Sequence, residues 1–260
     1  MQKRSSFKVF RTVVYALVLR EMQGRFGRMR MGAMWTIFEP LTHILAIMAI
    51  MVFLRGRTMP GLDFPVFLLV SLSAFLLFKN IALKLMGSVE ANKALFAYKQ
   101  IQPFSTFVAR VVVEFSLSAT VFLILLVVFT WIGYDTRIVH PIEWMGILAL
   151  GICFGFALGV TLALIVNIIP ESKMVLRLIF MPLYLLSAVI YSPTHFPASW
   201  MPLLLWNPFL HILELIRVNV FPFYRMADGI SLQYVIECTL VLLFLGMGMY
   251  RLRRLQLMSL

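Results

Sequence analysis

Charged residues are scarce in this chain of 260 residues. Asp, Glu, Lys and Arg make up 13% of it, about half the share found in a soluble domain. Hydrophobic residues make up 62%, and a water-soluble globule of this length has too little interior to hide so much apolar surface. The composition therefore excludes a soluble enzyme domain and a disordered chain. At about 20 residues per crossing, the length fits six or seven membrane-spanning helices.

Cysteines are few and the common catalytic motifs are missing. Cys153 and Cys238 fall inside apolar runs, which indicates small core residues rather than a zinc site or a disulfide framework. No phosphate-binding G-x-x-x-x-G-K-[ST] loop, H-E-x-x-H motif or G-x-S-x-G elbow occurs. We therefore expect a protein that is not catalytic by itself, holds no metal or cofactor and draws its energy from elsewhere.

Apolar segments predict an all-α membrane protein with six transmembrane helices. The predicted spans are about 33–54, 64–85, 104–133, 144–169, 174–192 and 230–250. The stretch 193–229 is also apolar, but it contains Pro193, Pro197, Pro202, Pro208 and Pro222. Each proline removes a backbone hydrogen bond, so this stretch predicts short re-entrant or external helices before the last span.

Residues 1–32 are basic and predict an amphipathic helix lying in the cytoplasmic interface, ahead of a transmembrane domain over 33–260. Phe10, Val13 and Leu17 recur on one helical face, and nearby arginines would meet anionic lipid headgroups. The alternative is an ordinary flanking segment that is basic because it stays inside the cell.

Basic residues outnumber acidic ones by 23 to 11, which gives a net charge of +12. If the N-terminus is inside, the predicted inside segments hold 18 of the Lys and Arg residues and the outside segments hold 5. This asymmetry favours a cytoplasmic location for both termini. The excess of positive charge is then explained without nucleic acid.

A few charged residues fall within or near the predicted spans, where charge is costly. The long side chains of Lys79 and Lys84 can reach the headgroups, although a functional role stays open for Lys79. Arg110 and Glu114 are four residues apart, so they can share a helical face and pair. Glu237 lies inside the last span and needs a partner or water.

Three glycines, Gly151, Gly155 and Gly159, form a row on one face of the fourth predicted span. Small residues on one face let two membrane helices approach closely. Packing within the subunit is the favoured interpretation, and a contact between subunits is the alternative.

Three stretches resemble type-2 ABC export permeases, in the order that this family has them. Arg25–Trp35, followed by Glu39 and Pro40, is similar to the basic segment that leads into the family's first span. Ile169–Lys173 resembles the short cytoplasmic loop before the fifth span, and Trp206–Arg217 resembles the N-P-[LF] external segment of polysaccharide-exporting members. The resemblance covers essentially the whole chain and is strongest to the capsular polysaccharide exporters of Gram-negative bacteria.

This resemblance implies the permease subunit of an ATP-driven exporter that moves capsular polysaccharide, on a lipid anchor, across the bacterial inner membrane. A separate ATPase subunit would bind ATP and Mg, and two permease copies would pair with two ATPase copies. The other implied partners are a periplasmic polysaccharide co-polymerase, outer-membrane export proteins, the polysaccharide and membrane lipids. The alternatives are a permease of the same architecture for O-antigen or teichoic acid, and one for drugs or other small molecules.

The resemblance also implies which residues couple the ATPase to the spans. The segment between the second and third spans mixes apolar anchors with charges, as a helix that docks on a soluble partner does; a surface turn is the alternative. The coupling candidates are Glu90, Asn92, Lys93, Leu95, Phe96, Tyr98, Lys99, Glu171, Ser172 and Lys173.

A path for a hydrated glycan needs aromatic faces that stack on sugar rings, and arginines would attract an acidic polymer or a lipid phosphate. The candidates are Arg25, Arg28, Arg30, Trp35, Phe38 and Glu39, with an interfacial-belt role for Trp35 an equal alternative. In the external segment, the candidates for gating or for docking a periplasmic partner are Asn207, Pro208, His211, Glu214 and Arg217. A solvated charged helix face is the simpler interpretation of the last three.

Overall fold

The computed structural model describes residues 5–26, 32–55, 58–59, 62–98 and 100–259, and it is an all-helical bundle apart from one short hairpin. Its long helices are α2 (Gly32–Arg55), α3 (Phe64–Met86), α5 (Pro103–Ile132), α6 (Pro141–Ile168) and α10 (Leu232–Ser259). Within the described ranges, these five helices contain the segments that are long and apolar enough to cross a membrane. The predicted all-α membrane architecture is confirmed.

Shorter elements connect and cover these helices. They are α1 (Ser6–Phe26), the strands β1 (Thr58–Met59) and β2 (Leu62–Asp63), which pair antiparallel, α4 (Ser88–Asn92), η1 (Lys93–Ala97), α7 (Ser172–Leu186), η2 (Pro193–His195), η3 (Ala198–Trp200), α8 (Met201–Leu204) and α9 (Pro208–Val220). With 15 residues, α7 is about 22 Å long, less than the roughly 30 Å of a bilayer core. The six-span count therefore stays a prediction.

Prolines mark the starts of several helices. Pro65, Pro103, Pro141 and Pro208 lie in the first turns of α3, α5, α6 and α9, where the missing N–H has no helical partner to lose. Gly133 ends α5 with a φ of 101°, the left-handed conformation that closes many helices. Residues 193–229 fold into the short helices η2, η3, α8 and α9, and their depth in the membrane stays a prediction.

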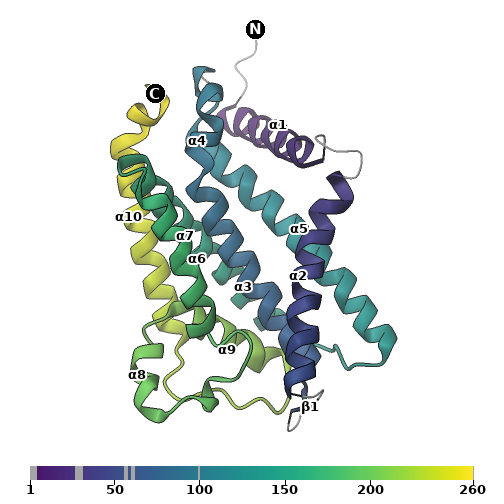
Figure 1. The fold of residues 1–260 in the computed structure, drawn as a ribbon. Helices are drawn as coiled ribbons and strands as arrows, with labels where there is room; N and C mark the ends of the chain where they lie inside the picture. Colours follow the sequence, from purple (N-terminus) through teal and green to yellow (C-terminus); the bar gives the residue numbers. More distant parts are fainter. Residues whose placement is uncertain (1–4, 27–31, 56–57, 60–61, 99, 260) are drawn as a thin grey trace.

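The two ends of the bundle differ (Figure 1). Both termini, α1 and α4 lie at one end, which we call the terminal end; β1 and α8 lie at the opposite end. At the terminal end, α1 crosses the bundle and packs on α5. Leu17 is buried against the protein, and the Phe10 ring stacks 6.2 Å from that of Phe104. The face predicted to be apolar is thus turned toward the bundle.

The centre of the bundle is α3, which packs against α2, α5, α6, α7 and α9. Phe67, Phe75 and Phe78 of this helix are fully buried. Because α3 is covered on nearly every side, it forms the fixed wall against which the other helices are placed.

The glycine row of α6 faces α3, and the two helices approach each other closely along it. A Cβ atom would lie 2.3 Å from Phe78 Cζ if added at Gly151 and 3.0 Å from the Phe78 backbone oxygen if added at Gly155. At Gly159 it would lie 3.0 Å from Ala82 Cα. These contacts confirm that the row serves packing within the subunit.

We expect Gly159→Ala to destabilise the protein, because its Cβ would lie 2.8 Å from Leu85 Cβ and the two helices would have to separate. Overpacking of this kind costs about 1–3 kcal/mol. Thermal unfolding of the purified protein in detergent measures the effect. Gly146→Ala is the matched control on the same helix, because no atom lies within 4 Å of its added Cβ. Equal melting temperatures for the two variants would contradict this account of the row.

Candidate functional site

A polar cavity of about 440 Å³ lies toward the terminal end, between α1, α2, α3 and α5. We call it the polar cavity; its lining is Arg25, Trp35, Thr36, Glu39, Pro40, His43, Leu76, Lys79, Asn80, Lys84, Glu114, Leu117 and Ser118. Three candidates for the substrate path, Arg25, Trp35 and Glu39, are therefore brought together. Phe38 is 52% exposed and does not line this cavity. The candidates Arg28 and Arg30 lie outside the described residues.

A second cavity of about 300 Å³ adjoins the first and shares His43, Leu76 and Lys79 with it. We call it the cationic cavity, because α7 adds Arg177 and the described residues of its lining include no acidic one. Tyr184 also lines it, and the hydroxyl of Tyr184 is buried without a hydrogen-bond partner. Sequence reasoning missed His43, Arg177 and Tyr184, because these residues come together only when α2 and α7 pack beside α3.

Ion pairs hold α1 against α5 beside the polar cavity. Arg25 pairs with Glu114 and lies 3.5 Å from Glu21, and Arg110 Nε lies 3.6 Å from the carboxylate of Glu21. The predicted pairing of Arg110 with Glu114 on one helix face is wrong. Both residues are matched instead by opposite charges on α1, because that helix lies directly over them.

The two predicted coupling segments lie together at the terminal end. Lys173, in the first turn of α7, donates a hydrogen bond to Glu90 of α4 and forms an ion pair with it. This contact holds the pKa of Glu90 below its ordinary value, so the carboxylate stays charged at neutral pH. The exposed members of the two segments form what we call the coupling surface: Glu90, Lys93, Tyr98, Glu171 and the partly exposed Leu95, Ser172 and Lys173.

Two of the coupling candidates face into the protein. Asn92 is buried, accepts a hydrogen bond of 3.0 Å from the Arg20 guanidinium and donates one to the Ser88 carbonyl. Phe96 is 6% exposed. These two side chains hold the segment against the rest of the protein and are not available to contact a partner. Their predicted role as coupling contacts is therefore corrected. Lys99 lies outside the described residues.

At the opposite end, a fully buried arginine organises the segment that precedes α10. The guanidinium of Arg217 donates to Glu214 at 2.7 Å, to the Ser71 hydroxyl at 2.9 Å and to the Ala188 carbonyl at 2.6 Å. Its Cζ lies 4.3 Å from the centre of the Phe67 ring, a cation–π distance. One side chain therefore joins α9, α3 and the turn after α7.

The Glu214 carboxylate also accepts hydrogen bonds from donors other than Arg217. These donors are the Tyr224 hydroxyl, at 2.6 Å, and the Ala227 N–H, at 3.2 Å. Burial raises the pKa of Tyr224 to about 12, so the phenol keeps the proton that it donates. The loop after α9 is thus fastened to the buried ion pair.

His211 and Asn207 are also used within the protein. His211 Nδ1 accepts a hydrogen bond from the Ser231 N–H at 3.0 Å, which leaves Nε2 to donate to the Leu205 carbonyl at 2.8 Å. Asn207 caps α9 by accepting from the Phe209 N–H at 3.0 Å, ahead of Pro208 in the first turn.

The interpretation of His211, Glu214 and Arg217 as a solvated face is wrong, because their exposed fractions are 2%, 0% and 0%. Their spacing is the same whether the face of α9 meets water or a polar network. Because α9 packs on α3, α6 and α10, this face meets the polar network and not water.

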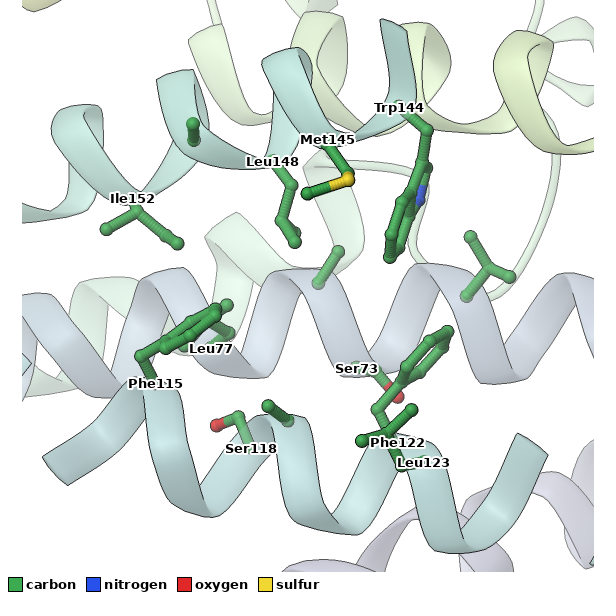
Figure 2. Close-up of a pocket in the computed structure, with 14 residues that line it drawn as sticks. Ser73, Leu77, Phe115, Ser118, Phe122, Leu123, Trp144, Met145, Leu148 and Ile152 are labelled. Carbon is green, nitrogen blue, oxygen red and sulfur yellow. The ribbon is translucent and has the colours of Figure 1, made fainter. Parts of the chain in front are cut away.

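A third cavity, of about 350 Å³, lies between α3, α5 and α6 (Figure 2). Phe122 and Trp144 close it from opposite helices, with ring centres 5.9 Å apart, and Leu77 and Leu148 also point into it. An almost wholly apolar lining offers a hydrated sugar too few hydrogen-bond partners. The polar and cationic cavities are therefore the stronger candidates for a glycan path.

The sequence over residues 12–221 matches the family described as ABC-2 type transporter. This chain belongs to the ABC-2 transporter family.

Several curated relatives of this ABC-2 protein match it along nearly their whole length. The polysialic acid transport protein KpsM of Escherichia coli is 36% identical over 250 residues, which are 96% of each chain. The capsule polysaccharide export inner-membrane protein BexB of Haemophilus influenzae is 24% identical, over 95% of this chain and 93% of its own. CtrC of Neisseria meningitidis serogroup B, which bears the same description, is 25% identical over 94% and 92%.

We expect Arg217→Met to destabilise this ABC-2 protein strongly, because it leaves the Glu214 carboxylate buried without its cation. Breaking a buried pair in this way costs about 3–5 kcal/mol. Thermal unfolding in detergent, followed by circular dichroism, measures the loss. Arg137→Met is the matched control, because Arg137 is exposed. An unchanged melting temperature for Arg217→Met would show that the network contributes little.

Proposed function

We propose that this chain is the inner-membrane permease of an ATP-driven exporter of acidic capsular polysaccharide, whose ATP is hydrolysed by a separate subunit. The observation that carries the proposal is the pair of joined polar and cationic cavities among apolar helices. Polar and charged groups at membrane depth are costly and commonly mark a transport path. The descriptions of the relatives, polysialic acid transport and capsule polysaccharide export, support this substrate class.

The lining of the cavities suits an acidic glycan. Trp35 is 65% exposed at the polar cavity, so its ring is available to stack on a sugar. The charge of Arg25 is offset by Glu114, whereas no ion pair neutralises Lys79 within the described residues. Because Lys79 also lines both cavities, it is the cation best placed to attract a carboxylate of the polymer or the phosphate of a lipid anchor.

The coupling surface would receive the ATPase subunit. A groove of about 540 Å³ between α1 and η1, lined in part by Leu95 and Tyr98, adjoins it. The ion pair of Glu90 with Lys173 joins α4 to the start of α7, and α7 carries Arg177 into the cationic cavity. A displacement of α4 by ATP binding would thus move one wall of the substrate path.

The remaining proposed partners would meet surfaces that are exposed in this chain. A second copy of the chain would cover the side on which α2 and α7 flank α3, where Phe53 is 88% and Met181 76% exposed. A periplasmic co-polymerase and the outer-membrane export proteins would meet residues 193–229, where Trp206 is 80% exposed. In this arrangement the terminal end, with both termini, is cytoplasmic.

We expect Lys79→Gln to lower surface polysaccharide about tenfold, a loss of roughly 1.4 kcal/mol of substrate binding, while polymer accumulates inside. Surface glycan is stained on intact cells and total glycan is measured after lysis, in a deletion strain that carries each variant. Lys8→Gln on the exposed face of α1 is the control. Wild-type export by the Lys79 variant would reject this residue as a substrate contact. Unchanged surface and internal glycan in the deletion strain itself would reject polysaccharide export.

We expect Glu90→Lys to lower export and substrate-stimulated ATP hydrolysis, because it places like charges at Lys173 and loosens α4 from α7. The double variant Glu90→Lys with Lys173→Glu restores opposite charges and should recover most of the activity. ATP hydrolysis by the reconstituted complex is the measurement. A double variant no better than Glu90→Lys alone would show that the pair itself does not carry the coupling.

A further inference from the structure

A single carboxylate lies on an exposed side of α10. Glu237 is the only charged residue between Leu232 and Tyr250, and it lies in the candidate span Leu232–Leu257. It is five residues from the helix start, about 7.5 Å at 1.5 Å per residue. Its side chain is exposed, and one oxygen accepts a hydrogen bond of 2.8 Å from the Gln233 amide. Within the described residues, no cation pairs with it.

This carboxylate lines an apolar groove of about 800 Å³ between α6, α7, α9 and α10. Among the described residues, Glu237 is the only charged member of the lining, which otherwise includes Phe154, Leu183 and Val241. Beyond the groove, exposed positions spaced by three or four residues continue from Glu237 along the same side of α10. We call this row, which runs from Glu237 to Gly248, the seam. Val241 is 57% and Phe244 79% exposed, and no atom lies within 4 Å of a Cβ added at Gly248.

We propose that this groove and seam bind a membrane-spanning helix of a partner subunit, which places a Lys or Arg side chain beside Glu237. A carboxylate on a lipid-facing surface is costly, and a cation on a neighbouring helix removes that cost. The seam from Glu237 to Gly248 is about 16 Å long, roughly half the bilayer core. The apolar groove provides the packing, and Glu237 fixes the depth and the identity of the partner helix.

Two other occupants fit the charge less well. The phosphate of a phospholipid would be repelled by Glu237, and a lipid chain has no cation to place along the apolar groove beside this carboxylate. In a two-fold contact through this face, the same groove and seam of the second copy would face Glu237, and among the described residues of the groove lining there is no cation to pair with it. A cationic helix from a different subunit satisfies both the groove and the carboxylate.

Photo-crosslinking in native membranes tests the proposal. A photoreactive phenylalanine analogue at Val241, in the full chain and the assembled exporter, should give a protein adduct. Peptide mapping should place that adduct in a membrane-spanning helix with Lys or Arg within one turn of the cross-linked residue. Glu237→Gln keeps the size and the contact with Gln233 and should lower the yield about fivefold, as expected for the loss of one charge pair. The analogue at Leu123, exposed on α5, is the control position.

Charge reversal separates a specific contact from loss of folding. Glu237→Lys should abolish the adduct, and a partner variant with Glu in place of its mapped cation should restore it. Melting temperatures in detergent identify any variant that fails to fold. An adduct with a second copy of this chain, an adduct with lipid alone, or a yield that Glu237→Gln leaves unchanged would each overturn the proposal.

Discussion

Neither hydrocarbon nor a packed protein interior offers water to a charged side chain, and this constraint explains where the buried charges of the bundle lie. Arg217 is the clearest case, because its guanidinium is fully buried and bonded to Glu214, Ser71 and the turn after α7. The same requirement explains why α1 sets Glu21 and Arg25 against the charges of α5. Chain segments that composition alone would leave loosely attached are thereby fixed in place. The cost of an unpaired charge, more than any gain from pairing, selects these arrangements.

Close packing of α3 on α6 gives the polar and cationic cavities one rigid wall. Phe78 meets the glycine row of α6, whereas Lys79, the next residue along α3, lines the cationic cavity between α2 and α7. Successive residues of a helix point about 100° apart, so one helix can be locked on one side and functional on another. The adjacent wall is α7, which is short and is tied at its start to α4. An exporter of this build would change the shape of its path at that wall rather than at α3.

The sequence was enough for the long helices, because apolar runs of membrane length and first-turn prolines are local signals. It was also enough to predict that the glycine row packs closely on another helix, and the structure identifies that helix as α3 of the same subunit. Sequence reasoning failed for Arg110 and Glu114, which pair with α1 instead of with each other. It failed again for the charged face of α9, which is buried. In both cases a helical spacing gave the face correctly, but the neighbour of that face is set by tertiary packing.

Charged groups that are paired inside the protein and charged groups that are not therefore indicate different roles. Arg217 and Glu214 have every requirement met inside the protein, so their variants report on stability. Within the described residues, Lys79 lines a cavity and forms no ion pair, and the exposed Glu237 has the Gln233 amide, but no cation, as a partner. Both charges are energetically unfavourable in the chain by itself. Charged residues of this kind are retained where a ligand or partner supplies the opposite charge. A mobile acidic substrate suits the open cavity at Lys79, whereas a fixed helix suits the long apolar seam at Glu237.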